Sequence, residues 1–136
     1  MLIQPYLTFN GNCREAFEYY HKVLGGSIEV MQTHGESPAK DFTPPEWHDA
    51  IIHARLNTGG QVLMGSDAPP DYQEKMGGFS ISVTVSDEQL ADRIFAGLAE
   101  GGSVTMPLAE TFWAPKFGMC TDRFSVHWMV NYVKGA

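Results

Sequence analysis

The sequence lacks three features, each of which would define a class of protein. It has no apolar run of the roughly 20 residues that a membrane-spanning helix needs, and its first residues read as a strand rather than as a signal peptide. Its 9 lysines and arginines are dispersed and outnumbered by 16 aspartates and glutamates, so no basic patch could follow a nucleic-acid backbone. Its two cysteines, Cys13 and Cys120, are too few for a disulfide framework. We therefore expect no membrane or nucleic-acid partner, and a reducing, cytoplasmic setting.

The hydrophobic pattern predicts an α+β fold in one domain, which 136 residues are enough to build around a substantial core. Two helices are expected where apolar residues recur at helical spacing and a Gly-Gly pair follows. Strands are expected where apolar and polar residues alternate, or where short apolar runs end in turn residues. The expected helices are 13–24 and 87–99, the strands are 2–9, 27–32, 79–85 and 103–106, the hairpins are 48–56 with 61–67 and 118–121 with 126–132, and a long loop covers 33–47.

Residues at the element boundaries also carry predictions. Asn12, with Glu15 three residues later, is expected to cap the first helix, and Ser86 is expected to cap the second. Ile3 is expected to lie on the buried face of the first strand because it is in phase with Leu7.

The chain contains an internal repeat. Residues 24–30 recur in similar form as residues 100–106, and the same order of strand, helix, Gly-Gly, strand and hairpin surrounds both copies. We therefore expect two βαβββ modules, residues 1–67 and 78–136, joined by a linker at 68–77. Each module would place a helix on one face of a concave mixed sheet and leave the other face free to line a ligand cavity.

The stretch 111–131 concentrates the aromatic residues of the chain. In its final strand, Trp128 falls on an apolar face together with its neighbours two positions away, which suits a core. The alternate residues His127, Met129 and Asn131 form a mixed face, which suits the wall of a ligand cavity.

Several motifs resemble the PhnB-like subgroup of the vicinal oxygen chelate superfamily, which includes glyoxalase I, bleomycin-resistance proteins and extradiol dioxygenases. The resemblance covers nearly the whole chain and rests on residues 5–12, 53–54, 66–68, 101–107 and 111–131. Ser125 departs from the pattern, because the subgroup usually has glycine there. The resemblance implies the paired βαβββ fold. Members are often labelled 3-demethylubiquinone-9 3-methyltransferase-like, but this sequence has no glycine-rich strand-to-helix turn of the kind that cradles a nucleotide.

The resemblance also implies where a metal would bind, since superfamily enzymes place one ligand on the first and last strand of each module. The corresponding positions here are Gln4 or Tyr6, Met64 or Ser66, Ser80, and Met129. Thioethers and hydroxyls are poor ligands for the hard or borderline divalent ions of such enzymes. We therefore expect no metal and no other cofactor, with a divalent metal as the alternative.

Two histidines, His53 and His127, are candidates for a general base in the cavity, or for hydrogen-bonding wall residues. Cys13 stands at a helix N-terminus, where a thiol pKa can fall, but we expect it to be buried and inert.

The sequence therefore predicts a protein that binds a small aromatic or flat organic molecule in a sheet-lined cavity, with no reaction assigned. The alternatives are a metal-dependent lyase or dioxygenase, and a resistance-type protein that sequesters a drug. A homodimer is expected, as is common among superfamily members. The predicted ligand-binding residues are Tyr6, Thr8, His53, Met64, Ser80, Trp113, Phe117 and Met129.

Overall fold

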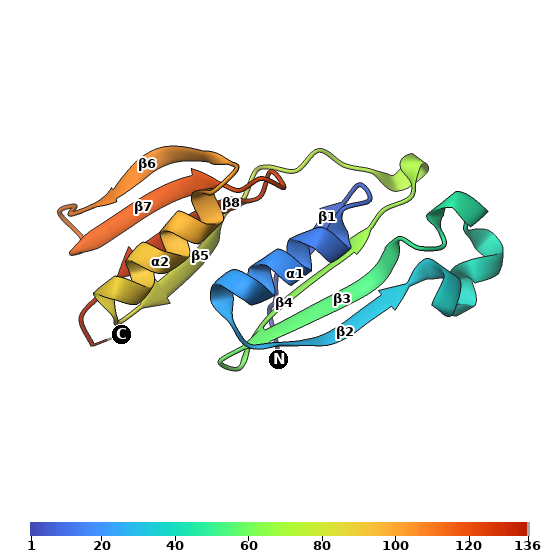
Figure 1. The fold of residues 1–136 in the computed structure, drawn as a ribbon, viewed down its shortest axis with the longest axis horizontal. Coiled ribbons are helices and arrows are strands. Elements are labelled where there is room, and N and C mark those ends of the chain that lie inside the picture. Colours follow the sequence, from blue (N-terminus) through green and yellow to red (C-terminus); the bar gives the residue numbers. More distant parts are fainter. Residues whose placement is uncertain (136) are drawn as a thin grey trace. The chain divides into compact units, whose positions relative to one another are not determined.

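The computed structural model describes residues 1–135 and divides the chain into two compact units, Met1–Lys75 and Met76–Ala136. Each unit contains one four-stranded mixed sheet with one α-helix against it (Figure 1). The predicted α+β class and the two similar βαβββ modules are confirmed. Within residues 1–135, no helix has the length and apolar character needed to cross a membrane.

The first sheet has the strand order β1-β4-β3-β2, in which β1 runs parallel to β4 and the other pairs are antiparallel. The long loop predicted after β2 contains three short 3₁₀ helices rather than irregular chain alone. The elements of this unit are β1 (Tyr6–Phe9), α1 (Cys13–Leu24), β2 (Ser27–Thr33), η1 (His34–Glu36), η2 (Pro38–Phe42), η3 (Pro45–Trp47), β3 (Ile51–Thr58), β4 (Gln61–Asp67) and η4 (Pro70–Tyr72).

The second sheet repeats this topology with the order β5-β8-β7-β6, and β5 runs parallel to β8. Its helix ends at Ala99, as the sequence predicts, whereas β6 extends three residues beyond the predicted end at Met106. The elements are β5 (Ile81–Val85), α2 (Glu88–Ala99), β6 (Ser103–Ala109), β7 (Lys116–Thr121) and β8 (His127–Tyr132).

Each unit has its own core, which fills the space between the sheet and its helix. In the first unit Phe17 and Tyr20 of α1 are fully buried, and in the second unit Leu98 of α2 and Trp128 of β8 are almost completely buried. Full burial of such a side chain stabilises the folded state by about 1.5–3 kcal/mol. One face of each sheet is therefore buried against its helix, and the opposite face is the one that a ligand could contact.

The repeated Gly-Gly pairs have a packing role in both units. A Cβ atom on Gly26 would collide with the backbone carbonyl oxygen of Asn57, and a Cβ on Gly102 would collide with that of Thr121. These glycines let the chain pass close to the third strand of each sheet as it leaves the helix. The sequence repeat is therefore also a repeat of a close backbone contact.

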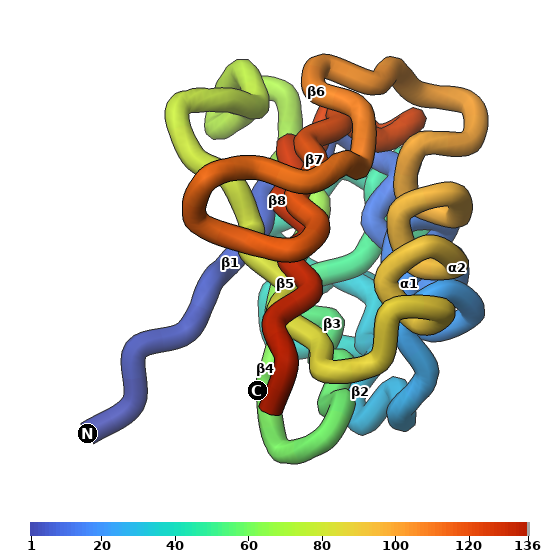
Figure 2. The backbone as a smooth tube through the Cα atoms, turned by 90° about the vertical axis from the view of Figure 1, so that its left-hand side faces the viewer, coloured from blue at the N-terminus to red at the C-terminus, as the bar shows by residue number. Residues whose placement is uncertain are grey.

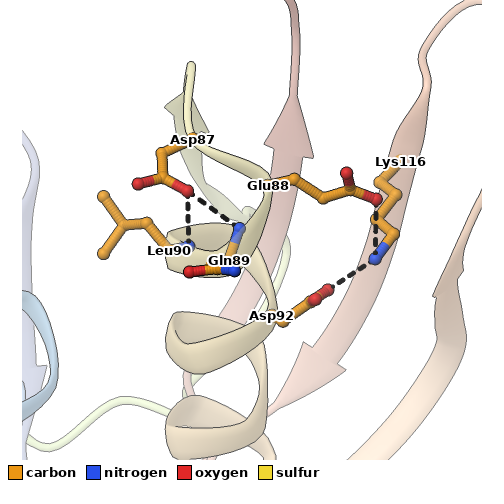
Figure 3. A network of polar contacts seen from close by, with 6 residues as sticks. All are labelled: Asp87, Glu88, Gln89, Leu90, Asp92 and Lys116. Atoms are coloured by element: carbon orange, nitrogen blue, oxygen red, sulfur yellow. Dashed lines mark hydrogen bonds and ion pairs between the residues drawn. The ribbon is translucent and has the colours of Figure 1, made fainter.

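Asn12 occupies the N-cap position of α1 as predicted, but the expected capping by its side chain is wrong, and so is the N-cap predicted at Ser86. The Asn12 side chain makes no capping hydrogen bond, and the backbone around the start of α1 is held instead by Asp67, at the end of β4. Helix α2 is capped by Asp87 rather than Ser86. The Asp87 carboxylate accepts hydrogen bonds from the backbone N–H groups of Gln89 and Leu90 (Figure 3).

Helix α2 is also tied to its sheet by an ion-pair network. The Lys116 ammonium on β7 lies 2.8 Å from an Asp92 oxygen and 3.2 Å from a Glu88 oxygen (Figure 3). The hydrogen bond to Asp92, followed by the one to Glu88, raises the pKa of Lys116. This places the Lys116 side chain on the helix face of the second sheet.

The first strand is shorter than predicted. It begins at Tyr6, and the residues before it extend away from the first sheet as an arm (Figure 2). Ile3, predicted to be in the core, is 92% exposed. Hairpin strand β3 likewise starts at Ile51, so His48 lies outside it. In both places proline or 3₁₀ turns interrupt the strand pattern.

Candidate functional site

The candidate functional surface of the second unit is the sheet face opposite α2, which we call the second open face. Strand register arranges its side chains in three rows across β7 and β8: Thr121 beside His127, Met119 beside Met129, and Phe117 beside Asn131. On β8 these residues are half-buried and alternate with fully buried Trp128 and Val130. The predicted division of this strand into a core face and a mixed face is therefore confirmed.

Each row of the second open face has its own chemistry. At one end, the Thr121 hydroxyl lies 2.8 Å from Nδ1 of His127, which fixes the orientation of the imidazole. The middle row is made of methionine. At the other end, the Trp113 ring lies edge-on to Phe117 with centroids 5.3 Å apart. Asn131 in this last row has a buried side-chain oxygen with no hydrogen-bond partner.

The face of the first sheet that lies away from α1, the first open face, is more polar. Tyr6 and Thr8 on β1 pair with Met64 and Ser66 on β4. Across β4, the Tyr6 hydroxyl lies 3.2 Å from Nδ1 of His53, and the two rings are stacked with centroids 5.8 Å apart and an interplanar angle of 16°. Four of the predicted ligand-binding residues thus lie together on one face of one unit.

An ion pair continues this polar face along β2 and β3. Nε of Arg55 donates to a Glu29 oxygen at 2.8 Å, and both side chains are partly exposed. Gln32 on β2 pairs with His53 in the register. The sequence prediction missed Arg55 and Gln32 as members of this face. The alternation of residues 53 and 55 along one strand was the signal that could have identified Arg55.

The register aligns the two units residue by residue. Met64 pairs with Tyr6 and Arg55, and Met129 pairs with Ser82 and Met119, so the two methionines occupy equivalent positions. Ser82, not Ser80, is therefore the β5 residue beside Met129. Ser80 precedes β5 and is exposed.

The two candidate histidines do not occupy equivalent positions in the repeat. His53 stands two residues before Arg55 and so corresponds to Phe117, which stands two residues before Met119. His127 corresponds to Val62 by the same argument. The two histidines are therefore separate features, each held by a hydroxyl group of its own unit.

The metal positions implied by the superfamily do not fit a divalent ion of the kind bound by its enzymes. The register puts a phenol and a thioether at Tyr6 and Met64, and a hydroxyl and a thioether at Ser82 and Met129. Within the described part of the chain, no three His, Cys, Asp or Glu side chains form a group that could hold a metal ion. A thioether and hydroxyl donor set is a poor match for Zn²⁺, Mn²⁺ or Fe²⁺.

Neither cysteine is placed to act as a nucleophile. Cys13 and Cys120 are both buried and unpaired. Burial, with a further contribution from Asp67, raises the pKa of the Cys13 thiol. Burial, with a contribution from Asp122, raises the pKa of Cys120 to about 11. Both thiols are consequently protonated at neutral pH and poorly reactive.

Known proteins share both the sequence and this fold. Protein YjdN of Escherichia coli K12 is 37% identical over 98% of this chain and 97% of its own length. Protein PA1353 from Pseudomonas aeruginosa, whose crystal structure is known, is 54% identical in sequence. The two structures superpose with a TM-score of 0.91, and the match covers 98% of both chains. A putative 3-demethylubiquinone-9 3-methyltransferase, PhnB protein, from Bacillus cereus superposes with a TM-score of 0.81 at 24% identity, covering 98% of this chain and all of the other.

The fold extends to a wider group. A glyoxalase/bleomycin resistance protein/dioxygenase family enzyme from Burkholderia phytofirmans PsJN has a TM-score of 0.64 at 16% identity, over 94% of this chain and 96% of its own. At this identity the likeness shows the fold alone. The family model described as 3-demethylubiquinone-9 3-methyltransferase matches residues 2–131. The chain belongs to this family, and its fold is shared with glyoxalase/bleomycin resistance protein/dioxygenase family proteins.

Proposed function

We propose that this protein binds a small, flat and largely apolar organic molecule, such as an aromatic compound, on its second open face. The observation that carries the proposal is the pairing of Met119 with Met129 in the middle of that face, next to the Trp113 and Phe117 rings. Methionine side chains are flexible and polarizable, so they adapt to the outline of a bound ring. Aromatic rings offer both an edge and a face for packing.

The second open face also disfavours other ligand classes. Its paired rows on β7 and β8 contain no lysine, arginine, aspartate or glutamate, and the Lys116 side chain pairs with α2 on the opposite side of the sheet. A sugar phosphate would need cationic side chains or a helix N-terminus with free N–H groups. An apolar face with a hydrogen-bonding group at each end suits an aromatic molecule with few polar substituents.

The spacing of the rows suggests the size of the ligand. His127 and Asn131 are four residues apart on β8, which is about 13 Å along a strand. A molecule of about two fused rings would span the methionine row and reach the polar group at one end. Binding is the proposed function, and no reaction is assigned.

The methyltransferase activity in the family description is not part of this proposal. Gly26 and Gly102 follow the helices and lie against backbone carbonyl groups, so neither Gly-Gly pair forms a loop that cradles a nucleotide. A cofactor such as S-adenosylmethionine has no recognisable binding motif among these residues.

The proposal is tested by titrating the protein with 2-naphthol while following tryptophan fluorescence, with glucose 6-phosphate as the comparison ligand. The wild type should bind 2-naphthol and not the sugar phosphate. Met129→Glu should weaken 2-naphthol binding by on the order of 100-fold, about 2.8 kcal/mol, because it places a charge on the apolar row.

Val104→Glu is the matched control. Val104 is half-exposed on β6 and pairs with Cys120, so the same charge enters the same sheet away from the methionine row. This variant should bind 2-naphthol like the wild type. Equal affinities of the wild type and Met129→Glu would overturn the proposal, as would a wild type that does not bind 2-naphthol.

A further inference from the structure

The first open face carries a second set of contacts that the proposed function does not use. Tyr6 and His53 come from β1 and β3, the strands on either side of β4, and meet above it. They lie away from the core: Tyr6 is 48% exposed, and the fully buried residues of the unit lie on the α1 side of the sheet. The pair is thus accessible to a ligand.

The contact with Tyr6 fixes both the position and the hydrogen-bonding state of His53. Stacking at 5.8 Å and 16° restricts the tilt of the imidazole, and the 3.2 Å contact engages Nδ1. A neutral imidazole has one N–H group, and a phenol O–H is the better donor of the two groups. When Tyr6 donates to Nδ1, the imidazole proton is on Nε2. Within residues 1–135, Nε2 makes no hydrogen bond, which leaves one free donor on this face.

Arg55 supplies positive charge beside this donor. It stands two residues after His53 on β3, on the same side of the sheet and about 7 Å along the strand. Nε–H of Arg55 donates to Glu29. Because a guanidinium has five N–H donors, the N–H groups of the two terminal nitrogens remain available to a ligand. Thr8 and Ser66, which both carry hydroxyl groups, pair in the register of the neighbouring strands β1 and β4. The first open face is therefore rich in hydrogen-bond donors.

This donor set favours a carboxylate over a phosphate. A planar carboxylate matches an arginine fork and one additional N–H donor, and it needs only one cation. Phosphate sites in proteins commonly use free N–H groups at a helix N-terminus. The start of α1 does not supply such groups here, because α1 packs against the opposite face of the sheet and its first N–H group, that of Cys13, is bound to Asp67.

We propose that the first open face is a binding site for small organic carboxylates, in which Nε2–H of His53 and the Arg55 guanidinium donate to the carboxylate oxygens and Tyr6 orients the imidazole. The residues of this site all belong to the first unit, whereas the proposed function rests on residues of the second unit. This site goes beyond the proposed function and does not depend on it.

The test uses benzoate and benzamide, which have nearly the same shape but differ in charge, with the protein labelled with ¹⁵N in its histidine rings. Benzoate should shift the His53 Nε2 resonance and bind at least 10-fold more tightly than benzamide. His53→Gln and Arg55→Gln should each weaken benzoate binding at least 10-fold. Tyr6→Phe should weaken it less and should broaden or move the free His53 resonances, because the orienting hydrogen bond is lost.

His21→Gln is the control, since His21 is exposed on α1, away from this face, and the variant should bind benzoate like the wild type. Equal affinity for benzoate and benzamide in the wild type would overturn the proposal, as would a His53→Gln variant that binds benzoate normally. Titration of the same variants with 2-naphthol separates the two sites. Those binding curves should be unchanged even where benzoate binding is lost.

Discussion

Ser125 adopts a conformation that its side chain disfavours. It closes the turn between β7 and β8 with a φ of 72°, and it is the one residue other than glycine with a positive φ in the described part of the chain. The turn is held by Asp122, whose Oδ1 accepts hydrogen bonds from the N–H groups of Phe124 and Val126. Because these bonds determine the backbone path, the strain at Ser125 cannot relax locally.

Ser125→Gly should therefore stabilise the protein by about 1 kcal/mol, because glycine reaches positive φ without steric cost. Urea denaturation measures the change. Ser103→Gly, at the start of β6 where φ is not positive, is the control and should destabilise the protein slightly. Lower or unchanged stability of Ser125→Gly would contradict the prediction.

The buried thiols predict a dependence of stability on alkaline pH. Burial raises the pKa of Cys120 to about 11, whereas a thiol in the unfolded chain ionises near its ordinary value of about 8.5. As the pH rises between these two values, the unfolded state loses the proton and the folded state keeps it, so ionisation favours unfolding. The free energy of unfolding should be unaffected by this thiol below pH 8 and should fall from about pH 8.5 towards pH 11.

Urea denaturation at pH values from 7 to 11 tests this prediction by comparison of the wild type with Cys120→Ala. Cys120→Ala should be less stable than the wild type at pH 7, because removing the buried sulfur leaves a cavity. Its free energy of unfolding should decline less steeply at alkaline pH. Parallel curves would show that the thiol does not contribute.

At the scale of elements, the two helices begin in different ways. The start of α1 depends on a residue from the far end of β4: Oδ1 of Asp67 accepts the N–H groups of Gly11 and Cys13 at 2.9 Å, and Oδ2 accepts that of Ile51 at 2.8 Å. Asp67 is 2% exposed and thereby links α1, β3 and β4. Helix α2 is capped locally by exposed Asp87.

The same substitution at the two aspartates should have different effects. Asp67→Asn should destabilise the protein by about 2–4 kcal/mol, because the amide offers one acceptor oxygen and turns an N–H donor towards buried N–H groups. Asp87→Asn should change stability by less than about 0.5 kcal/mol, since asparagine is an equally good N-cap. Chemical denaturation of both variants is the measurement, and similar losses for the two would refute the role assigned to Asp67.

At the scale of the whole molecule, the repeat has kept its architecture while its two open faces have diverged. Arg55 of the first unit stands where the second unit has Met119, and His53 stands where the second unit has Phe117. The first open face is therefore polar, and the second open face is apolar. Met64 and Met129 are alike, as are Thr8 and Thr84. The two sheets are therefore expected to bind different chemical groups.

Those methionines also lead to a prediction about metal content. Since the resemblance implies metal ligands at Met64 or Ser66 and at Met129, where the side chains offer only thioethers or a hydroxyl, protein purified without chelators should contain far less than one atom of Ni, Zn, Fe or Mn per chain. Elemental analysis measures this directly. A value near one atom per chain would show that the thioether and hydroxyl donors had been misjudged.

We also propose that the protein is a homodimer. Leu2, Ile3, Phe112 and Trp113 are large apolar side chains that are more than half exposed in the chain. Such groups are often covered by a partner. Light scattering at micromolar concentration should give twice the 15.0 kDa mass of the chain. A particle of 15.0 kDa would contradict the proposal.

Much of the architecture was predictable because it depends on neighbours in the sequence. The alternation that separates Trp128 from Met129 is a property of one strand, and the burial pattern of β8 confirms it. The Gly-Gly repeat marked both helix ends. By contrast, Ile3 matched the pattern of β1 but is exposed, because proline follows two residues later and β1 begins only at Tyr6.

The candidate site was only partly predictable. Strand alternation correctly put Tyr6 and His53 on the polar sides of their strands, yet nothing local indicates that they stack across β4 or that Arg55 joins them. The strand register expected from the sequence puts Ser80 at the implied metal-ligand position on the first strand of the second module. The actual register shifts this role by two residues, to Ser82.

The sequence by itself determined which segments form strands and helices, where the two helices end, and which side of each strand is apolar, because these depend on backbone geometry and side-chain periodicity over a few residues. The tertiary structure alone decided which residues meet across strands: Tyr6 with His53, Thr121 with His127, and Asp67 with the start of α1. Such contacts join side chains and backbone groups of different elements, whose relative position is set by the strand register and not by the local sequence.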